Sequence, residues 1–69
     1  MTEFALNDYE FIELNKLLKI LKLVGSGGQA NMLITNKEVT VNGAIETQKR
    51  KKLRKGDTIV FESNSIVII

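Results

Sequence analysis

Cationic side chains gather in one short stretch of the chain, and clustered cations are suited to binding polyanions. Six of the ten Lys and Arg residues lie in residues 47–56, TQKRKKLRKG, which contain no acid and which we call the basic segment. Like charges at this density repel one another, so they favour a polyanionic partner that relieves the repulsion. The alternative is a solvated loop that only aids solubility. The candidate phosphate contacts are Lys49, Arg50, Lys51, Lys52, Arg54 and Lys55.

A second candidate anion contact lies at the start of a predicted helix. Ser26 and Gln29 form a capping box, in which the Ser26 hydroxyl accepts from the Gln29 N–H and the Gln29 side chain reaches back to the Ser26 N–H. Gly27 and Gly28 would let an anion approach the free N–H groups of this helix closely. Alternatively, the glycines only permit a tight turn between two helices. The Lys-Ser/Thr pair of a P-loop is missing, so nucleotide hydrolysis is not expected.

The composition excludes most catalytic chemistry. The 69 residues include no Cys and no His, which removes the usual zinc, haem and iron–sulfur ligands and histidine acid–base catalysis. A chain of this length buries only about 60% of the surface that its unfolded form exposes, which leaves little room for a deep cleft. We therefore expect a single domain, residues 1–69, that is not an enzyme and holds no metal or cofactor. Lysines interrupt the most hydrophobic stretch and no signal peptide is recognisable, so a cytoplasmic location is expected.

The aromatic residues disfavour recognition of unpaired bases. Phe4, Tyr9, Phe11 and Phe61 are the only aromatics, and none lies within the basic segment, where bases could stack on it. We expect Phe11 and Phe61 in the core. A surface rich in cations and poor in aromatics would contact the backbone and shape of a structured RNA or a duplex.

Two helices are expected upstream of the basic segment. The first has an apolar face with i, i+3, i+4, i+7 spacing, formed by Leu14, Leu17, Leu18 and Leu21. Either Asp8 or Asn15 could cap its start, and Gly25 is expected to end it. The second helix starts at the Ser26 cap, and Asn36 is expected to end it in a left-handed conformation. A linker of about two residues would make the pair an αα-hairpin.

The rest of the chain is expected to form short strands. Alternation and apolar runs place them at residues 39–41, 44–46, 58–61 and 66–69, with an edge strand at residues 4–6. Asn-Gly is the strongest short signal for a type I′ hairpin turn. Turns are predicted at Asn42-Gly43, Gly56-Asp57 and Asn64-Ser65.

The basic segment joins two of the predicted hairpins, so we expect a loop or irregular strand beside the second helix. Leu53 interrupts its charges and is expected to anchor it to the core, which would fix the neighbouring cations in place. If these cations lie near residues 26–31 at the start of the second helix, the two form one electropositive surface. Lys37, beyond that helix, would extend it.

The order of these features resembles the RNA-binding domain first seen in small-subunit ribosomal protein S-four, also called the alpha-L motif. The matching residues are Leu14, Leu17, Leu18, Ser26, Gly27, Gly28, Gln29, Ala30, Val39, Val41, Asn42, Gly43, Gly56, Asp57 and Ile59. The match covers roughly residues 12–62 and is similar to a stand-alone small bacterial subgroup. It implies an α+β fold with an αα-hairpin packed on a small, mostly antiparallel β-sheet. RNA would bind along the start of the second helix and the adjacent β loops.

The resemblance also implies which residues take part. Many members carry an Arg at the position of Gly27 and a basic residue at the position of Asn31, so the basic segment would supply more of the affinity here. Asn31 and the hairpin residue Asn42 are carried over as RNA contacts. The expected function is non-enzymatic binding of structured RNA, namely ribosomal RNA or the ribosome, by a monomer without membrane contact, in ribosome assembly or function. The alternative is a protein–protein adaptor whose basic segment docks on an acidic partner.

Overall fold

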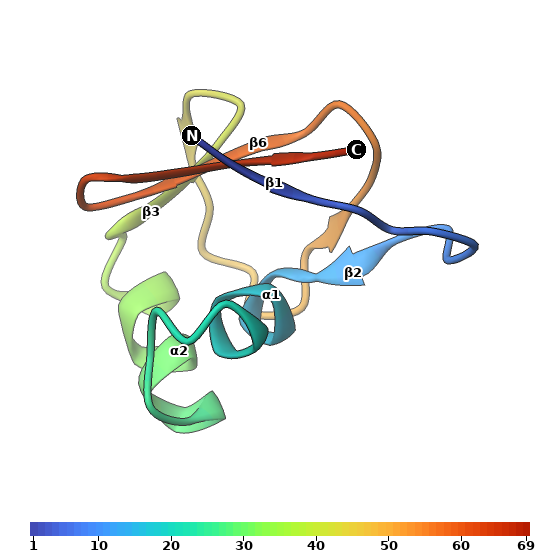
Figure 1. The fold of residues 1–69 in the computed structure, drawn as a ribbon. Coiled ribbons are helices and arrows are strands. Elements are labelled where there is room, and N and C mark those ends of the chain that lie inside the picture. Colours follow the sequence, from blue (N-terminus) through green and yellow to red (C-terminus); the bar gives the residue numbers. More distant parts are fainter.

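The computed structural model describes residues 1–69 and places both helices on the same side of the main sheet (Figure 1). The helices are α1, Leu14–Ile20, and α2, Gly27–Thr35. The strands are β1, Thr2–Phe4; β2, Ile12–Glu13; β3, Val39–Val41; β4, Ala44–Ile45; β5, Lys52–Leu53; β6, Thr58–Phe61; and β7, Asn64–Ile68. Neither helix is long or apolar enough to cross a membrane.

The main sheet has the strand order β1-β7-β6-β3-β4. All its pairs are antiparallel except β1 with β7 at one edge, which are parallel. Strands β2 and β5 form a separate antiparallel pair, with Ile12 opposite Leu53. The predicted α+β fold with a mostly antiparallel sheet is confirmed, and so is an N-terminal edge strand, although it begins two residues earlier than expected.

The core consists of 14 buried residues, all of them apolar, so no buried charge has to be compensated. Helix α1 contributes Leu14, Leu17 and Leu18, which are fully buried as their spacing predicts. Leu21 is only partly buried against this cluster. Phe61 is 4% exposed, which confirms its predicted place in the core.

Helix α1 differs from expectation at both ends. It begins after Glu13, whose side chain makes no capping bond, so neither Asp8 nor Asn15 is the cap. It ends at Ile20 because Lys22 adopts a left-handed conformation with φ of 59°, well before Gly25. The Leu23 N–H donates to Leu18 O and the Lys22 N–H to Lys19 O, which is the bonding of a Schellman motif. The linker to α2 is consequently six residues long, and not about two.

Helix α2 ends in the same way. The left-handed residue is Lys37, with φ of 64°, whereas Asn36 has φ of −80° and is not the terminator that the sequence suggested. The N–H groups of Lys37 and Glu38 donate to Ile34 O and Leu33 O. Lysine thus takes the position that glycine usually fills at both helix ends.

The hairpin turns agree with the sequence at two of three places. Asn42 and Gly43 have φ of 53° and 85°, as a type I′ turn requires. Gly56, with φ of 94°, turns the chain into β6. The third prediction is wrong, because Asn64-Ser65 already belong to β7, with Asn64 opposite Phe61. The turn lies two residues earlier, where Glu62 takes a φ of 55°.

Candidate nucleic-acid interface

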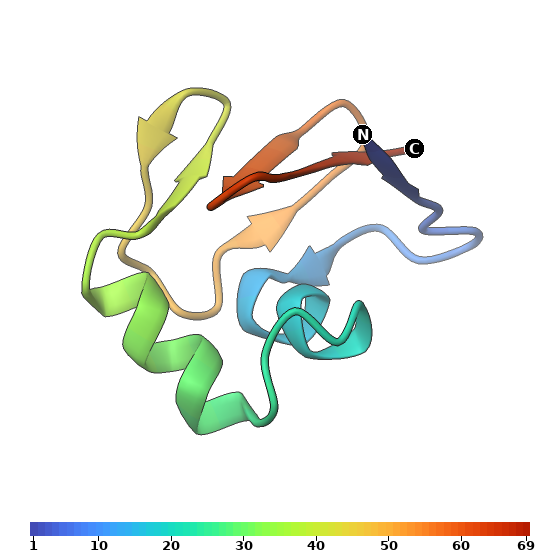
Figure 2. The ribbon, with the colours of Figure 1, turned by 60° about the vertical axis from the view of Figure 1, so that its left-hand side comes forward.

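The basic segment is held to the body of the protein by backbone bonds. Lys51 O accepts from the Leu14 N–H at 2.9 Å, and Lys49 O accepts from the Asn15 N–H at 3.0 Å. Beyond these bonds the chain enters β5, where Leu53 is fully buried, as predicted. The segment therefore lies across the start of α1 and along β2. The conditional placement of its cations near residues 26–31 at the start of α2 stays a prediction. Figure 2 shows this connection leaving β4, descending to the helices and returning as β5.

The charged side chains of the basic segment point outward. All of its cations are exposed except Lys51, which is partly buried. The chain has a single ion pair, between Lys16 Nζ and Glu13 Oε1 at 3.8 Å, so no cation of the basic segment is paired with a carboxylate. Unpaired cations on a fixed backbone are available to phosphates, which arginine can hold bidentately.

Both ends of the loop that contains the basic segment are fastened together. The Asn42 amide donates to Asp57 Oδ1 at 2.9 Å, and Asn42 Oδ1 accepts from the Thr58 N–H at 2.9 Å. The other carboxylate oxygen, Asp57 Oδ2, accepts from the Arg54 N–H at 2.8 Å. Asn42, an expected RNA contact, thus uses its side chain within the protein.

These bonds also affect the pKa of the Asp57 carboxyl group. Burial alone would raise its pKa, but the hydrogen bonds from the Arg54 N–H and the Asn42 amide outweigh this effect. The positive charges of Lys51 and Arg54 act in the same direction. The pKa of Asp57 is therefore lowered from its ordinary value, and the carboxylate is the form that holds the loop closed.

The start of α2 leaves backbone donors accessible. Ser26 Oγ accepts from the Gln29 N–H at 3.2 Å, which confirms the cap. The reciprocal bond differs from expectation, because Gln29 Oε1 accepts from the Gly25 N–H at 2.7 Å and not from that of Ser26. The N–H groups of Gly27 and Gly28 have no acceptor within the helix, since they belong to its first turn.

The fold itself does not require the two glycines. Neither Gly27 nor Gly28 has a positive φ. A Cβ atom at Gly27 would meet nothing within 4 Å, and at Gly28 only Ser26 Oγ at 3.9 Å. The linker between the helices has six residues and is not a tight turn. The alternative that the two glycines only permit a tight turn is therefore not supported.

The remaining predicted residues do not form one patch. Asn31 Oδ1 accepts from Asn15 Nδ2 at 3.1 Å, which joins the middle of α2 to the start of α1, where Lys49 is bonded. Lys37 follows the C-terminal end of α2, whereas Ser26 precedes its start. A nine-residue helix spans roughly 13 Å, so these two residues lie at opposite ends of it.

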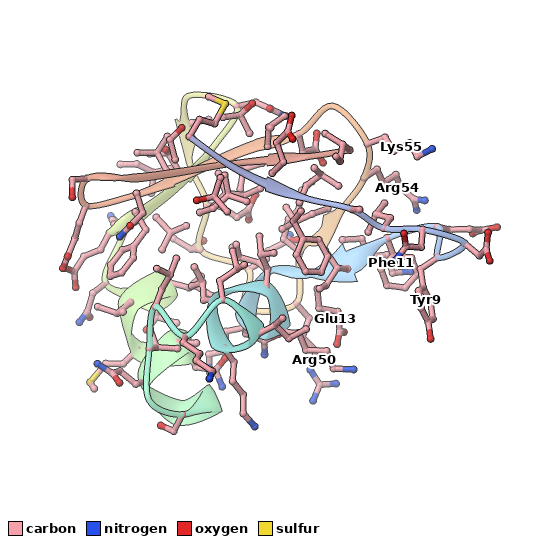
Figure 3. The ribbon with its side chains drawn as sticks, in the orientation of Figure 1. Tyr9, Phe11, Glu13, Arg50, Arg54 and Lys55 are labelled. Carbon is pink, nitrogen blue, oxygen red and sulfur yellow. The ribbon has the colours of Figure 1, made fainter.

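The position of Phe11 differs from the one predicted from the sequence. It belongs neither to the core nor to the partly buried side chains packed on it, so its predicted place in the core is wrong. Lys52 Nζ lies 5.0 Å and Arg54 Cζ 5.6 Å from the centre of its ring. Figure 3 shows Phe11 and Tyr9 on the side of the molecule that also carries Arg54 and Lys55. No local sequence signal indicates this position, because β2 has only two residues and pairs with β5 across about forty residues of chain.

Comparisons with known proteins agree with this architecture. The sequence pattern of the S4 domain matches residues 4–69. YbcJ of Escherichia coli (strain K12) is 38% identical over 69 residues, which are 100% of this chain and 99% of that protein. A Bacillus subtilis (strain 168) protein named "Probable ribosome maturation protein RlbA" is 34% identical over 55 residues, 80% of this chain and 78% of that one.

A solved structure matches as well. The solution structure of Escherichia coli YbcJ, described as revealing an alpha-L motif involved in RNA binding, aligns with a TM-score of 0.76 at 38% identity. The alignment covers 100% of this chain and 87% of that one. The capped α2, the Asn42-Gly43 turn and the Gly56-Asp57 turn thus occur in a fold shared along the whole chain. The chain belongs to the S4 domain family.

Proposed function

We propose that this protein is a non-enzymatic RNA-binding module that contacts the phosphates of structured RNA mainly through the basic segment. One observation carries the proposal: six cations lie on a loop that is closed at its base and bonded to α1, and none of them is paired with an acid. Cations that are not paired with an internal carboxylate bind phosphates without first breaking an ion pair. The contacts we propose are Lys49, Arg50, Lys51, Lys52, Arg54 and Lys55.

The start of α2 is the second proposed contact. The glycines there have no packing role, and a side chain at either position would stand near the N–H groups of the first turn. Such groups, together with the positive end of the helix dipole, attract phosphate. Ser26 and Gln29 would act by holding this turn in shape, and Asn42 by closing the loop. Asn31 and Lys37 would contribute where the RNA extends along α2.

The RNA we propose is ribosomal. The relative from Bacillus subtilis is named for ribosome maturation, and the YbcJ structure is described by its RNA-binding motif. A role in assembly or function of the ribosome, in the cytoplasm, follows for this chain as a proposal. No feature of the structure favours a protein–protein adaptor over an RNA-binding protein.

Binding to fragments of ribosomal RNA, measured against salt concentration, tests the proposal. Neutralising about four to six phosphates predicts a log–log slope of roughly −3 to −5. Arg50→Ala and Lys55→Ala should each weaken binding about fivefold and flatten the slope by about one. Lys19→Ala removes the same charge from α1 and should have a smaller effect.

Three results would count against the proposal. Absence of binding to every fragment at low salt excludes RNA as the partner. Equal losses for all three variants would mean that only net charge matters. If association with cellular partners survives nuclease treatment, the protein is an adaptor instead.

A further inference from the structure

The outer face of the β2/β5 pair combines an aromatic ring with cations. Ile12 and Leu53 lie opposite each other and face the core, so the flanking residues of both strands face outward. Continuing this register places Phe11 opposite Arg54, and Glu13 is paired with Lys52. The cation distances of 5.0 and 5.6 Å confirm that both basic side chains reach the ring.

This ring borders an open groove. The chain from the end of β1 through β2 lines it, together with Lys16 and Ile20 of α1, and most of the lining residues are apolar. Tyr9 also lines the groove and is 78% exposed. In the view of Figure 3, Tyr9 and Phe11 lie below Arg54 and Lys55, and Glu13 lies between them and Arg50. The ring of Phe11 is thus in contact with cations of the basic segment, Lys52 and Arg54, and borders the groove together with Tyr9.

We infer that this face binds an unpaired nucleotide of the RNA, whose base stacks on Phe11 and Tyr9. Every base has a π-face, so stacking on an aromatic side chain is largely independent of sequence. Lys52 and Arg54 would hold the adjoining phosphates. Their contacts with the ring are those of exposed side chains, which are weak enough to be exchanged for a phosphate.

The acids around the groove fit a base better than a phosphate. Asp8, Glu10 and Glu13 line it, and their carboxylates repel a phosphate that enters the groove. A carboxylate accepts hydrogen bonds from the exocyclic amino groups of bases. The groove is therefore suited to the base, while the cations beside it are suited to the backbone.

This inference rests on the proposed function and deepens it. Chain order places no aromatic in the basic segment, but the pairing of β2 with β5 brings Phe11 beside it. The RNA would then be structured but carry an unpaired nucleotide next to its helical part. The sequence disfavours recognition of unpaired bases because no aromatic lies within the basic segment. With Phe11 beside the segment, the outer face of the β2/β5 pair can bind an unpaired base.

A set of RNA duplexes tests the inference. One is blunt, and two others carry a single unpaired 2-aminopurine nucleotide at each 3′ end or at each 5′ end. We expect at least one of the two extended duplexes to bind at least about fivefold more tightly than the blunt one, with quenched 2-aminopurine fluorescence. Tyr9 is the only Tyr in a chain without Trp, so its own emission should fall when an extended duplex with an ordinary base binds.

The gain should disappear in Phe11→Leu and shrink in Tyr9→Ala, whose exposed side chain is not needed for folding. Ile45→Ala, which removes an exposed apolar side chain from β4, should retain it. Equal binding of blunt and extended duplexes, or a gain that persists in both aromatic variants, overturns the inference and leaves phosphate binding intact. Failure to bind any duplex overturns the proposed function and the inference together.

Discussion

The side-chain amide of Asn42 donates a hydrogen bond of 2.9 Å to the carboxylate of Asp57, fifteen residues further along the chain. Its carbonyl oxygen accepts from the Thr58 N–H, so both ends of the amide are used. These bonds fasten the turn after β3 to the turn before β6 and close the loop that displays the basic segment. The Asn-Gly and Gly-Asp pairs of the sequence therefore act together in closing the loop. We call the bonds from the Asn42 side chain to Asp57 and Thr58 the clasp.

Opening this clasp should destabilise the protein. Asn42→Ala leaves the Thr58 N–H without its partner and puts alanine in a left-handed conformation, so we expect a loss of about 2 to 3 kcal/mol in the free energy of unfolding. Asn42→Gly loses the same hydrogen bonds without the backbone strain and should cost about 1 kcal/mol less. Urea unfolding of both variants measures the difference. Equal stability of both variants and the wild type would mean that the clasp contributes nothing.

Asp57 should make stability depend on pH. Its pKa is lowered in the folded protein, so its contribution is fully present above the pKa of the unfolded chain, about 4, and is lost as pH falls through the folded value. Asp57→Asn should therefore be less stable than the wild type at pH 7, and the gap should narrow below about pH 4. Thermal unfolding of both proteins across this range is the measurement. A gap that stays constant with pH would show that the carboxylate charge has no part in the clasp.

The sequence predicts those parts of the fold that depend on local signals. Leucine spacing identifies the buried face of α1, Ser26 caps α2, and Asn42-Gly43 forms its turn, because each signal lies within a few neighbouring residues. The C-terminal ends of both helices differ from the predicted ones for a physical reason. Lys22 and Lys37 adopt left-handed conformations that are unusual for lysine, and packing of the residues beyond them, such as the buried Val24, outweighs the local cost.

In the candidate site, too, local features can be predicted from the sequence and contacts between distant residues cannot. The basic segment and the anchoring role of Leu53 follow from the chain order. The neighbours of the segment do not, because β2 and β5 contain two residues each and pair across about forty residues of chain. Strands this short have no recognisable periodicity, so Phe11 could be assigned to the face of the basic segment only from the structure.

The start of α2 offers a prediction in which stability and binding change in opposite directions. Gly28→Ala places a better helix former in the first turn without a clash, so the free energy of unfolding should rise by about 0.5 kcal/mol. The added methyl group hinders approach of a phosphate to the N–H groups, so RNA affinity should fall about fivefold. Thr35→Ala, at the other end of α2, is the control for helix propensity and should leave affinity unchanged. Unchanged affinity in Gly28→Ala would place the RNA away from this helix start.

Glu13 offers a prediction of tighter binding. Its carboxylate pairs with Lys16 at 3.8 Å and faces Lys52 across the β2/β5 pair, so it lowers the positive potential beside the basic segment. In this surface ion pair Lys16 is exposed and Glu13 partly buried, and surface ion pairs contribute little, so Glu13→Gln should cost less than about 1 kcal/mol of stability. The Gln side chain keeps an oxygen that can accept from a base but has no charge, so RNA affinity should rise about threefold at low salt. The gain should vanish at high salt because the repulsion between Glu13 and phosphates is screened. Glu62→Gln makes the same charge change at the turn between β6 and β7, and should give a smaller gain. If both variants gain equally in a binding titration at low salt, net charge and not the face of the β2/β5 pair determines affinity.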